Sequence, residues 1–342
     1  MTHHAYADPS AASYHLAAPL RVVPVVHELG GPTMGTRWSV KFWHPIGTPS
    51  PSHAVLREGI DAALATVVRQ MSPWEPDSDI SRFNRAGAGE WQTLPEPFFT
   101  VLHSALAMAR DSGDAYDPTV GPVVDLWGFG PAPARGTVPA AAELQAAHAR
   151  VGWQRIVLDV PQRRVRQPGG SRLDLSSIAK GHAVDAVARV LRERGCVNAL
   201  VEVGGELLGC GRRPDGEPWR VAVKLPGSAL ADGDAPGPVL SLPDLAVATS
   251  GDDFRHFVAD GERCSHTIDP RTGRPIRHAL ASVTVVHAQC MQADALATAL
   301  LVQGPEAGWA HAERLRLAAL FIRRSADGHE ARPTAAFEAL LA

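Results

Sequence analysis

The chain shows strand-like and helix-like patterns in an irregular order, and this order constrains its fold more than any other feature. Alternating stretches such as residues 37–43 and 219–225 predict half-buried strands, whereas the apolar spacing in residues 52–70 predicts a helix. A doubly wound parallel fold would need strand, helix and strand in repeated alternation. The sequence therefore predicts the α+β class, with mixed or antiparallel sheets flanked by helices.

The remaining elements are expected along the whole chain. Strands are predicted at 156–165 (a pair), 199–203, 239–242, 245–251, 281–287 and 318–323. Helices are predicted at 97–112, 140–151, 181–194, around Asp294, at 306–315 and at the C-terminus. A turn cluster is expected at 30–36, a polar segment at 77–84, and loops at 115–130 and 226–238. Residues 1–29 are interpreted as a flexible arm before one domain at 30–342.

Composition excludes several classes of protein. The 342 residues are 45% hydrophobic and 20% charged, with a net charge of -3, so nothing predicts bulk attraction to nucleic acid. No apolar run approaches the ~18 residues that span a bilayer. The four cysteines are scattered, which favours isolated thiols over disulfides. No Lys or Arg precedes Arg21, so a cytoplasmic protein is expected unless a processed start hides an export signal.

Two segments near the C-terminus carry the densest chemistry. Residues 265–273 place the base His266, the carboxylate Asp269 and the guanidinium Arg271 in a turn bounded by Pro and Gly. Further on, Asp294 and Thr298 lie four apart in a run rich in Ala and Leu, which puts both on one helix face. A carboxylate and a hydroxyl together suit Mg²⁺. Ordinary capping or a surface pair is the structural alternative.

Familiar catalytic signatures are absent: the sequence contains no P-loop, no GxGxxG after a strand, no GxSxG and no HExxH. Short polar clusters bounded by glycine remain, at Met34, Trp74, 116–117, 174–180, 204–205 and 249–251. Each has a structural reading: Lys180 as an exposed helix residue, Gly204 and Gly205 as a bulge, His266 as a core histidine. Together they are compatible with an enzyme that handles a phosphorylated aromatic ligand.

Taken in order, these clusters closely resemble the ApbE family, the Mg²⁺-dependent FAD:protein FMN transferases with a T-fold-related single domain. The resemblance covers roughly residues 30 to 320. It rests on eight motifs in one order: 33–36, 71–84, 117–122 with 127–130, 174–181, 203–206, 248–252, 266–275 and 294–298.

The resemblance implies that FAD is the substrate, that FMN is joined through phosphate to a Thr or Ser of a partner redox protein, and that AMP leaves. Flavin and adenine contacts would come from Met34, Trp74, Ala115, Tyr116, Asp117, Asp174, Lys180 and Ile268. One or two Mg²⁺ ions are implied, held by the Ser177 carbonyl, Asp294 and Thr298. His266 would be the general base, with Asp269 orienting it or approaching a second metal.

The chain departs from the family pattern in a few places. Trp74 stands where Tyr is usual, and Asp253 replaces an aromatic residue after the Ser-Gly-Asp turn. The usual export signal is missing, although a periplasmic address is the family-based alternative. Two rival functions stay open: a Mg²⁺-dependent hydrolase that splits FAD to FMN and AMP, and a flavin-binding protein without turnover.

Overall fold

The computed structural model describes residues 24–131, 136–226, 237–252, 255–259, 261–326 and 328–341. Most of the arm predicted for residues 1–29 lies outside these ranges, as do Asp253 and most of the loop predicted at 226–238. Where the arm is described, its last residues already belong to a strand that begins at His27. The ordered sheet therefore starts before the predicted boundary at residue 30.

A large antiparallel sheet forms the centre of the molecule. Its strands are β1 (His27–Thr33), β2 (Thr36–Trp43), β6 (Asn198–Val203), β7 (Glu206–Cys210), β10 (Ala246–Gly251), β15 (Leu280–His287), β16 (Ala318–Ser325) and β17 (Gly328–Pro333). They lie in the order β1-β2-β6-β7-β10-β15-β16-β17, and each neighbouring pair is antiparallel. The predicted α+β class with antiparallel sheets is confirmed.

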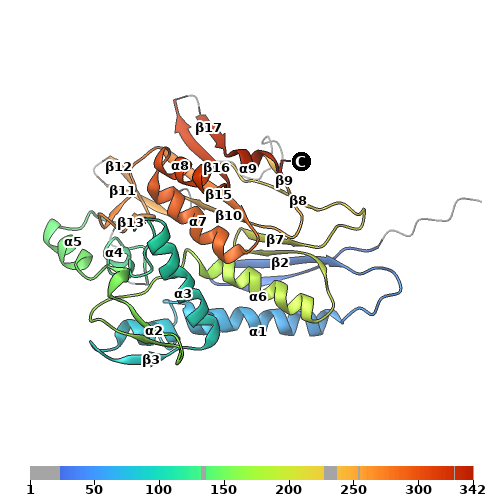
Figure 1. The fold of residues 1–342 in the computed structure, drawn as a ribbon, viewed down its shortest axis with the longest axis horizontal. Coiled ribbons are helices and arrows are strands. Elements are labelled where there is room, and N and C mark those ends of the chain that lie inside the picture. The colour runs from blue at the N-terminus through green and yellow to red at the C-terminus, as the bar shows by residue number, and fades with distance from the viewer. Residues whose placement is uncertain are drawn as a thin grey trace, which may run out of the picture.

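Helices cover one face of this sheet (Figure 1). They are α1 (His53–Met71), α3 (Glu96–Asp111), α6 (Ala179–Glu193), α7 (Cys290–Gln303) and α8 (Ala307–Arg314). Helix α6 lies between α1 and α7 and contacts both. The other face carries the hairpin β8 (Trp219–Ala222) with β9 (Val239–Leu242) and the short helix α9 (Ala335–Glu338).

The strands divide their side chains between these two layers. On β10, Ala248 packs with the α7 side, whereas its neighbour Val247 packs with Phe337 of α9. On β16, Phe321 and Leu320 are separated in the same way. Successive side chains of a strand point to opposite faces, so a sheet buried on both sides needs apolar residues at nearly every position. This explains the continuous apolar run of β15, which is almost entirely buried.

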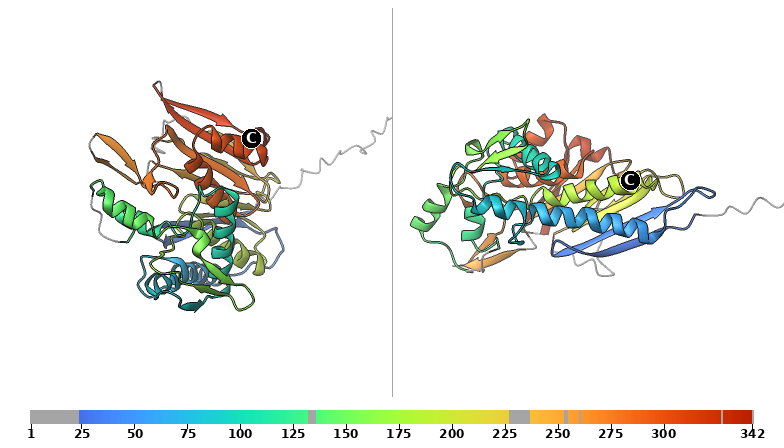
Figure 2. Two further views of the ribbon diagram at one scale, coloured as in Figure 1. Left: turned by 60° about the vertical axis from the view of Figure 1, so that its left-hand side comes forward. Right: turned by 90° about the horizontal axis from the view of Figure 1, so that it is seen from below.

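Smaller elements gather around the C-terminal end of α1 (Figures 1 and 2). They are α2 (Asp79–Arg85), the sheet of β3 (Trp91–Thr93), β5 (Arg164–Arg166) and β4 (Val157–Asp159), α4 (Gly121–Leu126), α5 (Ala141–His148) and the 3-10 turn Trp153–Arg155. Two small hairpins complete the fold: β11 (His256–Ala259) with β12 (Glu262–Ser265), and β13 (Ile268–Asp269) with β14 (Arg274–Pro275).

Several sequence-based boundaries were wrong. The turn cluster predicted at 30–36 is mostly strand β1, and only Met34 and Gly35, both with positive φ, form the turn. The polar segment at 77–84 contains helix α2, because the Ser78 hydroxyl accepts a hydrogen bond from the Ser81 amide as a cap. Helix α4 lies inside the predicted loop 115–130, and strand β17 was not predicted at all.

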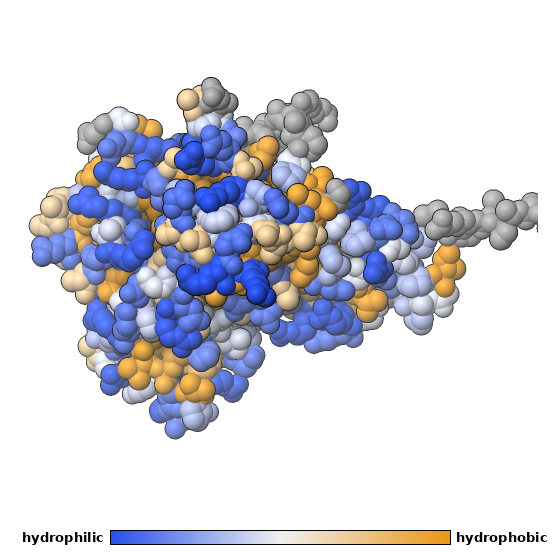
Figure 3. All heavy atoms as spheres, turned by 45° about the horizontal axis from the view of Figure 1, so that its top comes forward, coloured by the Kyte–Doolittle hydropathy of each residue, from blue (hydrophilic) through white to orange (hydrophobic). Residues whose placement is uncertain are grey.

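The surface pattern and the state of the cysteines agree with what the composition predicts. Figure 3 shows hydrophobic side chains in small groups between hydrophilic ones on the face that it presents. None of the helices among the described residues has both the length and the apolar character needed to cross a bilayer. Cys196, Cys210, Cys264 and Cys290 are all buried thiols.

Helix α6 carries a buried histidine that makes stability depend on pH. Burial, together with Arg189, lowers the pKa of His182 from 6.5 to about 4. The unfolded chain therefore binds this proton first as the pH falls, so stability is lost between pH 6.5 and about 4. We expect His182→Gln to make the free energy of unfolding less dependent on pH. The slope should fall by up to about 1.4 kcal/mol per pH unit in this window.

Urea unfolding across this pH range measures the effect. The matched control is His103→Gln, which alters an exposed histidine on α3. An acid sensitivity that falls equally in both variants would contradict the assignment to His182.

Candidate active site

The site is built where the N-terminal turn of α6 meets α7. The Gly181 amide on α6 donates a hydrogen bond of 3.0 Å to Asp294 Oδ2 on α7. A side chain at Gly181 would come within 2.8 Å of Met291 Cα, so glycine permits this approach. Asp185 then accepts hydrogen bonds of 2.9 Å from the amides of Cys290 and Met291, which caps the start of α7. The helices therefore hold Asp294 in a fixed place.

A lysine and two carboxylates meet at this junction. Lys180 Nζ forms an ion pair with Glu206 Oε1, and the charge of Asp294 acts on both residues. Burial would lower the pKa of Lys180, but Glu206 and Asp294 outweigh it and raise that pKa. Burial raises the pKa of Asp294 and of Glu206, and the charge of Lys180 opposes the rise in both. Lys180 therefore remains an ammonium inside a mostly buried, acidic cluster.

Tyr116 and Ser177 lie against the same cluster. The Ser177 hydroxyl and the Tyr116 hydroxyl are 3.2 Å apart, and Tyr116 is 2% exposed. Burial raises the pKa of Tyr116, and the nearby carboxylates add to the effect, so the phenol stays neutral. Ala115 is fully buried in the same hydrophobic cluster as the α7 residues Ala293 and Ala297. The structure therefore brings the predicted residues at 115–116, 177, 180 and 294 into one region.

The predicted metal ligands supply only oxygen atoms. Ser177 lies two residues before the start of α6, while Asp294 and Thr298 share α7. The Thr298 hydroxyl lies 2.8 Å from the Ser250 hydroxyl. No group of three or more His, Cys, Asp or Glu side chains suited to a metal occurs in the part that the structure describes. A cation here would rest on one carboxylate together with hydroxyl, carbonyl and phosphate oxygens. That set fits Mg²⁺, which keeps waters and substrate phosphates among its ligands.

His266 is oriented by a backbone carbonyl. Its Nδ1 donates a hydrogen bond of 3.0 Å to the Arg255 carbonyl oxygen, and its ring meets Phe129 edge to face. This bond keeps the proton on Nδ1 and leaves Nε2 as the acceptor. Burial lowers the pKa of His266, which favours the neutral imidazole. The Arg255 guanidinium lies 5.7 Å from the ring centre of Trp74, so Trp74 belongs to the same neighbourhood.

Asp269 forms its hydrogen bonds within its own turn. Its carboxylate accepts hydrogen bonds from the Arg271 side chain at 2.9 and 3.0 Å and from the Arg271 amide at 3.0 Å. The turn that carries the pair is held from outside by Trp127, whose indole donates to the Gly273 carbonyl. Among the described residues, His266 bonds to the Arg255 carbonyl and Asp269 stabilises its own turn, so the suggested roles of Asp269, orienting His266 or approaching a second metal, stay predictions.

Asp117 is likewise committed to the fold. Its Oδ1 accepts hydrogen bonds of 2.7 Å from the amide and the hydroxyl of Thr119, and its Oδ2 accepts one of 3.0 Å from the Trp153 amide. Asp174 lies beside this loop, since its amide donates to the Pro118 carbonyl at 2.8 Å. These contacts make the Asp117 side chain an organiser of the loop, and its contact with flavin or adenine stays a prediction.

Comparison with known proteins decides the family. The model of the ApbE family matches residues 34–321. The chain belongs to the ApbE family. The resemblance predicted from the ordered motifs is therefore confirmed.

Relatives and solved structures in this family align over nearly their full length. The chain is 39% identical to the FAD:protein FMN transferase of Vibrio cholerae O395, over 92% of each protein. It is 36% identical to that of Haemophilus influenzae, over 96% of this chain and 95% of the relative. The apo structure of the Pseudomonas stutzeri flavinyl transferase ApbE superposes with a TM-score of 0.82 at 38% identity, covering 93% and 97%. The flavin transferase ApbE from Vibrio cholerae superposes with a TM-score of 0.84 at 37% sequence identity, over 93% of this chain and 100% of that one.

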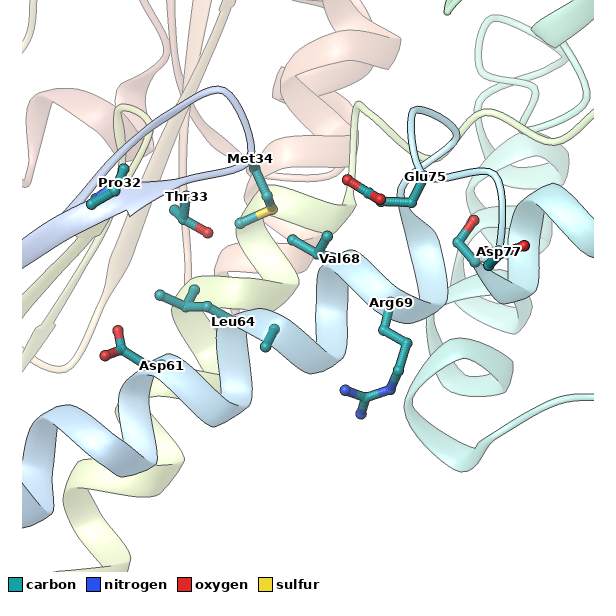
Figure 4. A pocket seen from close by; sticks show the side chains of 11 residues that line it. Pro32, Thr33, Met34, Asp61, Leu64, Val68, Arg69, Glu75 and Asp77 are labelled. Atoms are coloured by element: carbon teal, nitrogen blue, oxygen red, sulfur yellow. The ribbon is translucent and has the colours of Figure 1, made fainter.

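Within this ApbE fold, Met34 lies in the turn between β1 and β2. It lines a surface hollow of about 550 Å³ between the β1–β2 turn, α1 and the loop before α2. Figure 4 shows its side chain directed toward the face of α1 that carries Leu64 and Val68. Lys180 and Asp294 do not line this hollow. Ile268, buried at 6% exposure, packs in a separate cluster with Trp127 and Phe129.

Three residues of the site had no role in the sequence-based interpretation: Glu206, Ser250 and Arg255. Glu206 and Ser250 fall inside motifs of the ApbE resemblance, yet nothing in their spacing links them to Lys180 or Thr298. A signal for Glu206 existed in the preceding Gly204 and Gly205, which predict a tight turn. Arg255 contacts His266 through its backbone carbonyl, and a backbone contact cannot be predicted from the residue type.

Proposed function

We propose that this chain transfers FMN from FAD to a protein acceptor in a Mg²⁺-dependent reaction. The hydroxyl oxygen of an acceptor Thr or Ser attacks the phosphorus on the FMN side of the diphosphate. The bond from that phosphorus to the bridging oxygen breaks, and AMP leaves with the bridging oxygen. The acceptor hydroxyl gives up its proton to a base. The names of the relatives support the transfer of flavin, and the site supports the assignment of roles.

The observation that carries the proposal is the meeting of Lys180 and Asp294 at the α6–α7 junction. Phosphoryl transfer depends mainly on positioning and on neutralising charge. In this proposal Lys180 holds the diphosphate, and Asp294, Thr298 and the Ser177 carbonyl would hold Mg²⁺. When bound, the ion would neutralise charge on the phosphate oxygens.

His266 is the proposed base for the acceptor hydroxyl. Its Nδ1 proton is committed to the Arg255 carbonyl, so Nε2 is the atom that can accept a proton. A lowered pKa keeps this nitrogen available at neutral pH. Trp74, which is 52% exposed, would present its ring to the flavin or adenine at the entrance. The acceptor would approach from this side.

Incubation of the enzyme with FAD and MgCl₂, with and without a purified redox protein as acceptor, tests the proposal. We expect AMP in amounts that match the FMN attached to the acceptor, and little AMP without acceptor. Rapid AMP release without acceptor would favour FAD hydrolysis. FAD binding without AMP under any condition would favour a binding protein.

Lys180→Ala is expected to weaken FAD binding by about 1–3 kcal/mol, the range for a lost hydrogen bond to a charged group. Isothermal titration with FAD measures the change. Lys41→Ala on β2, an exposed position, is the control. Equal affinity of the Lys180 variant and the wild type would remove this lysine from the site.

A further inference from the structure

Glu206 is a buried carboxylate that the fold leaves half-satisfied. It is 2% exposed, and its Oε1 pairs with Lys180. Its Oε2 has no hydrogen-bond partner within the part of the chain that the structure describes. Burying a carboxylate is costly unless both oxygens are paired, so a purely structural ion pair would be poorly built in this way.

A tight hairpin delivers Glu206 to Lys180. Gly204 and Gly205 adopt φ values of 62° and 103°, which turns the chain directly from β6 into β7. A side chain at Gly204 would come within 2.9 Å of Thr36 and within 3.4 Å of Lys180 Cδ. The tip of the hairpin therefore packs on the lysine and on the residue that follows the Met34–Gly35 turn.

Titratable groups from other elements act on Glu206 as well. Lys180 comes from α6, Asp294 comes from α7, and the neutral thiol of Cys290 lies at the start of α7. Lys180 forms its ion pair with Glu206, and the charge of Asp294 acts on the same ammonium. Without Glu206, Asp294 is the one carboxylate among the described residues whose charge still acts on Lys180, and Asp294 is the group proposed for the cation.

We propose that Glu206 is a positioning residue for flavin transfer: it holds the Lys180 ammonium beside Asp294, where the diphosphate of FAD would bind. This inference rests on the proposed function. The task of Glu206 is to hold the lysine, and it differs from the metal binding proposed for Asp294 and from the base role proposed for His266. Glu206 thereby leaves Asp294 available for the cation.

Glu206→Gln removes the charge and keeps the shape, and Glu206→Asp keeps the charge. Glu202→Gln is the matched control, because Glu202 lies on β6 of the same hairpin and accepts a hydrogen bond of 2.9 Å from Ser39. We expect Glu206→Gln to weaken FAD binding about tenfold in the presence of EDTA, the scale of a lost charge-assisted contact. The loss should grow from about pH 7 to about pH 10, because a buried lysine that has lost its ion-pair partner gives up its proton more easily.

Glu206→Asp should recover part of the affinity and of the wild-type pH profile, whereas Glu202→Gln should match the wild type. In transfer assays, Glu206→Gln should raise the KM for FAD more than it lowers kcat. Affinity, KM and pH profile of Glu206→Gln equal to those of Glu202→Gln would overturn the proposal. If Glu206→Gln does not fold, Glu206→Asp decides: wild-type affinity with a lowered unfolding midpoint would assign Glu206 a structural role only.

A second readout needs no FAD. The rate at which an amine-acylating reagent modifies Lys180 can be followed by peptide mass spectrometry near pH 8. We expect faster modification in Glu206→Gln than in the wild type or in Glu202→Gln, and equal rates would contradict the inference. A wild-type protein that neither binds FAD nor transfers FMN would refute the proposed function, yet this labelling would still decide the role of Glu206.

Discussion

Replacing Asp294 by alanine is expected to abolish flavin transfer, with a loss of about a thousandfold or more, because electrostatic stabilisation of the reacting phosphate is the largest contribution that this site can make. The protein should stay folded. Asp294 is 4% exposed, and burial raises its pKa, so its charge costs stability rather than adding to it. Transfer of FMN to an acceptor and the thermal unfolding midpoint are the two measurements.

Asp294→Asn separates charge from shape. The amide oxygen can still accept the hydrogen bond from Gly181, while the negative charge is gone. We expect this variant to be inactive and at least as stable as the wild type. An active Asn variant would contradict the assignment of Asp294 to the cation. An Ala variant that unfolds beside a stable, active Asn variant would show that only the hydrogen bond matters.

Gly181→Ala is expected to give the largest loss of stability, about 3 kcal/mol. The added methyl group would come within 2.8 Å of Met291 Cα and closer still to the Cys290 carbonyl oxygen. Backbone atoms cannot rotate away as a side chain can, so α6 and α7 would have to separate. Urea unfolding measures the loss. Because the same contact places Asp294, flavin transfer should fall with it.

Gly59→Ala on α1 is the matched control. Gly59 is also helical and buried, but a methyl group there would meet the guanidinium of Arg194 at 2.6 Å. That guanidinium is the end of a flexible side chain and can move aside, and alanine favours a helix over glycine by about 1 kcal/mol. We expect Gly59→Ala to be neutral or stabilising. Similar losses in both variants would contradict the account of the α6–α7 contact.

The local sequence pattern was sufficient to predict much of the fold and one half of the site. Helix α7 follows from its apolar run, and its periodicity puts Asp294 and Thr298 on one face. Lys180 lies in the first turn of α6, where the motif placed it. Strand β17 was missed because it is exposed along most of its length and lacks an alternating apolar pattern.

The other half of the site depends on contacts between distant segments. Glu206 reaches Lys180 only because β6 and β7 pair through a two-glycine turn that packs on α6. His266 takes its orientation from a carbonyl 11 residues earlier in the chain. Asp117 has the residue type of a ligand contact, but three hydrogen-bond donors within the fold occupy its carboxylate. Residue type alone cannot distinguish these cases.

The most direct test is mass spectrometry of candidate redox proteins from the same cells, incubated with the enzyme, FAD and MgCl₂. The account predicts an acceptor peptide that carries FMN through a phosphoester on Thr or Ser, with equal AMP released. It also predicts no such adduct when Asp294→Asn replaces the wild type. FMN attached at the wild-type level by that variant, or AMP released by the wild type with no adduct on any acceptor, would contradict it.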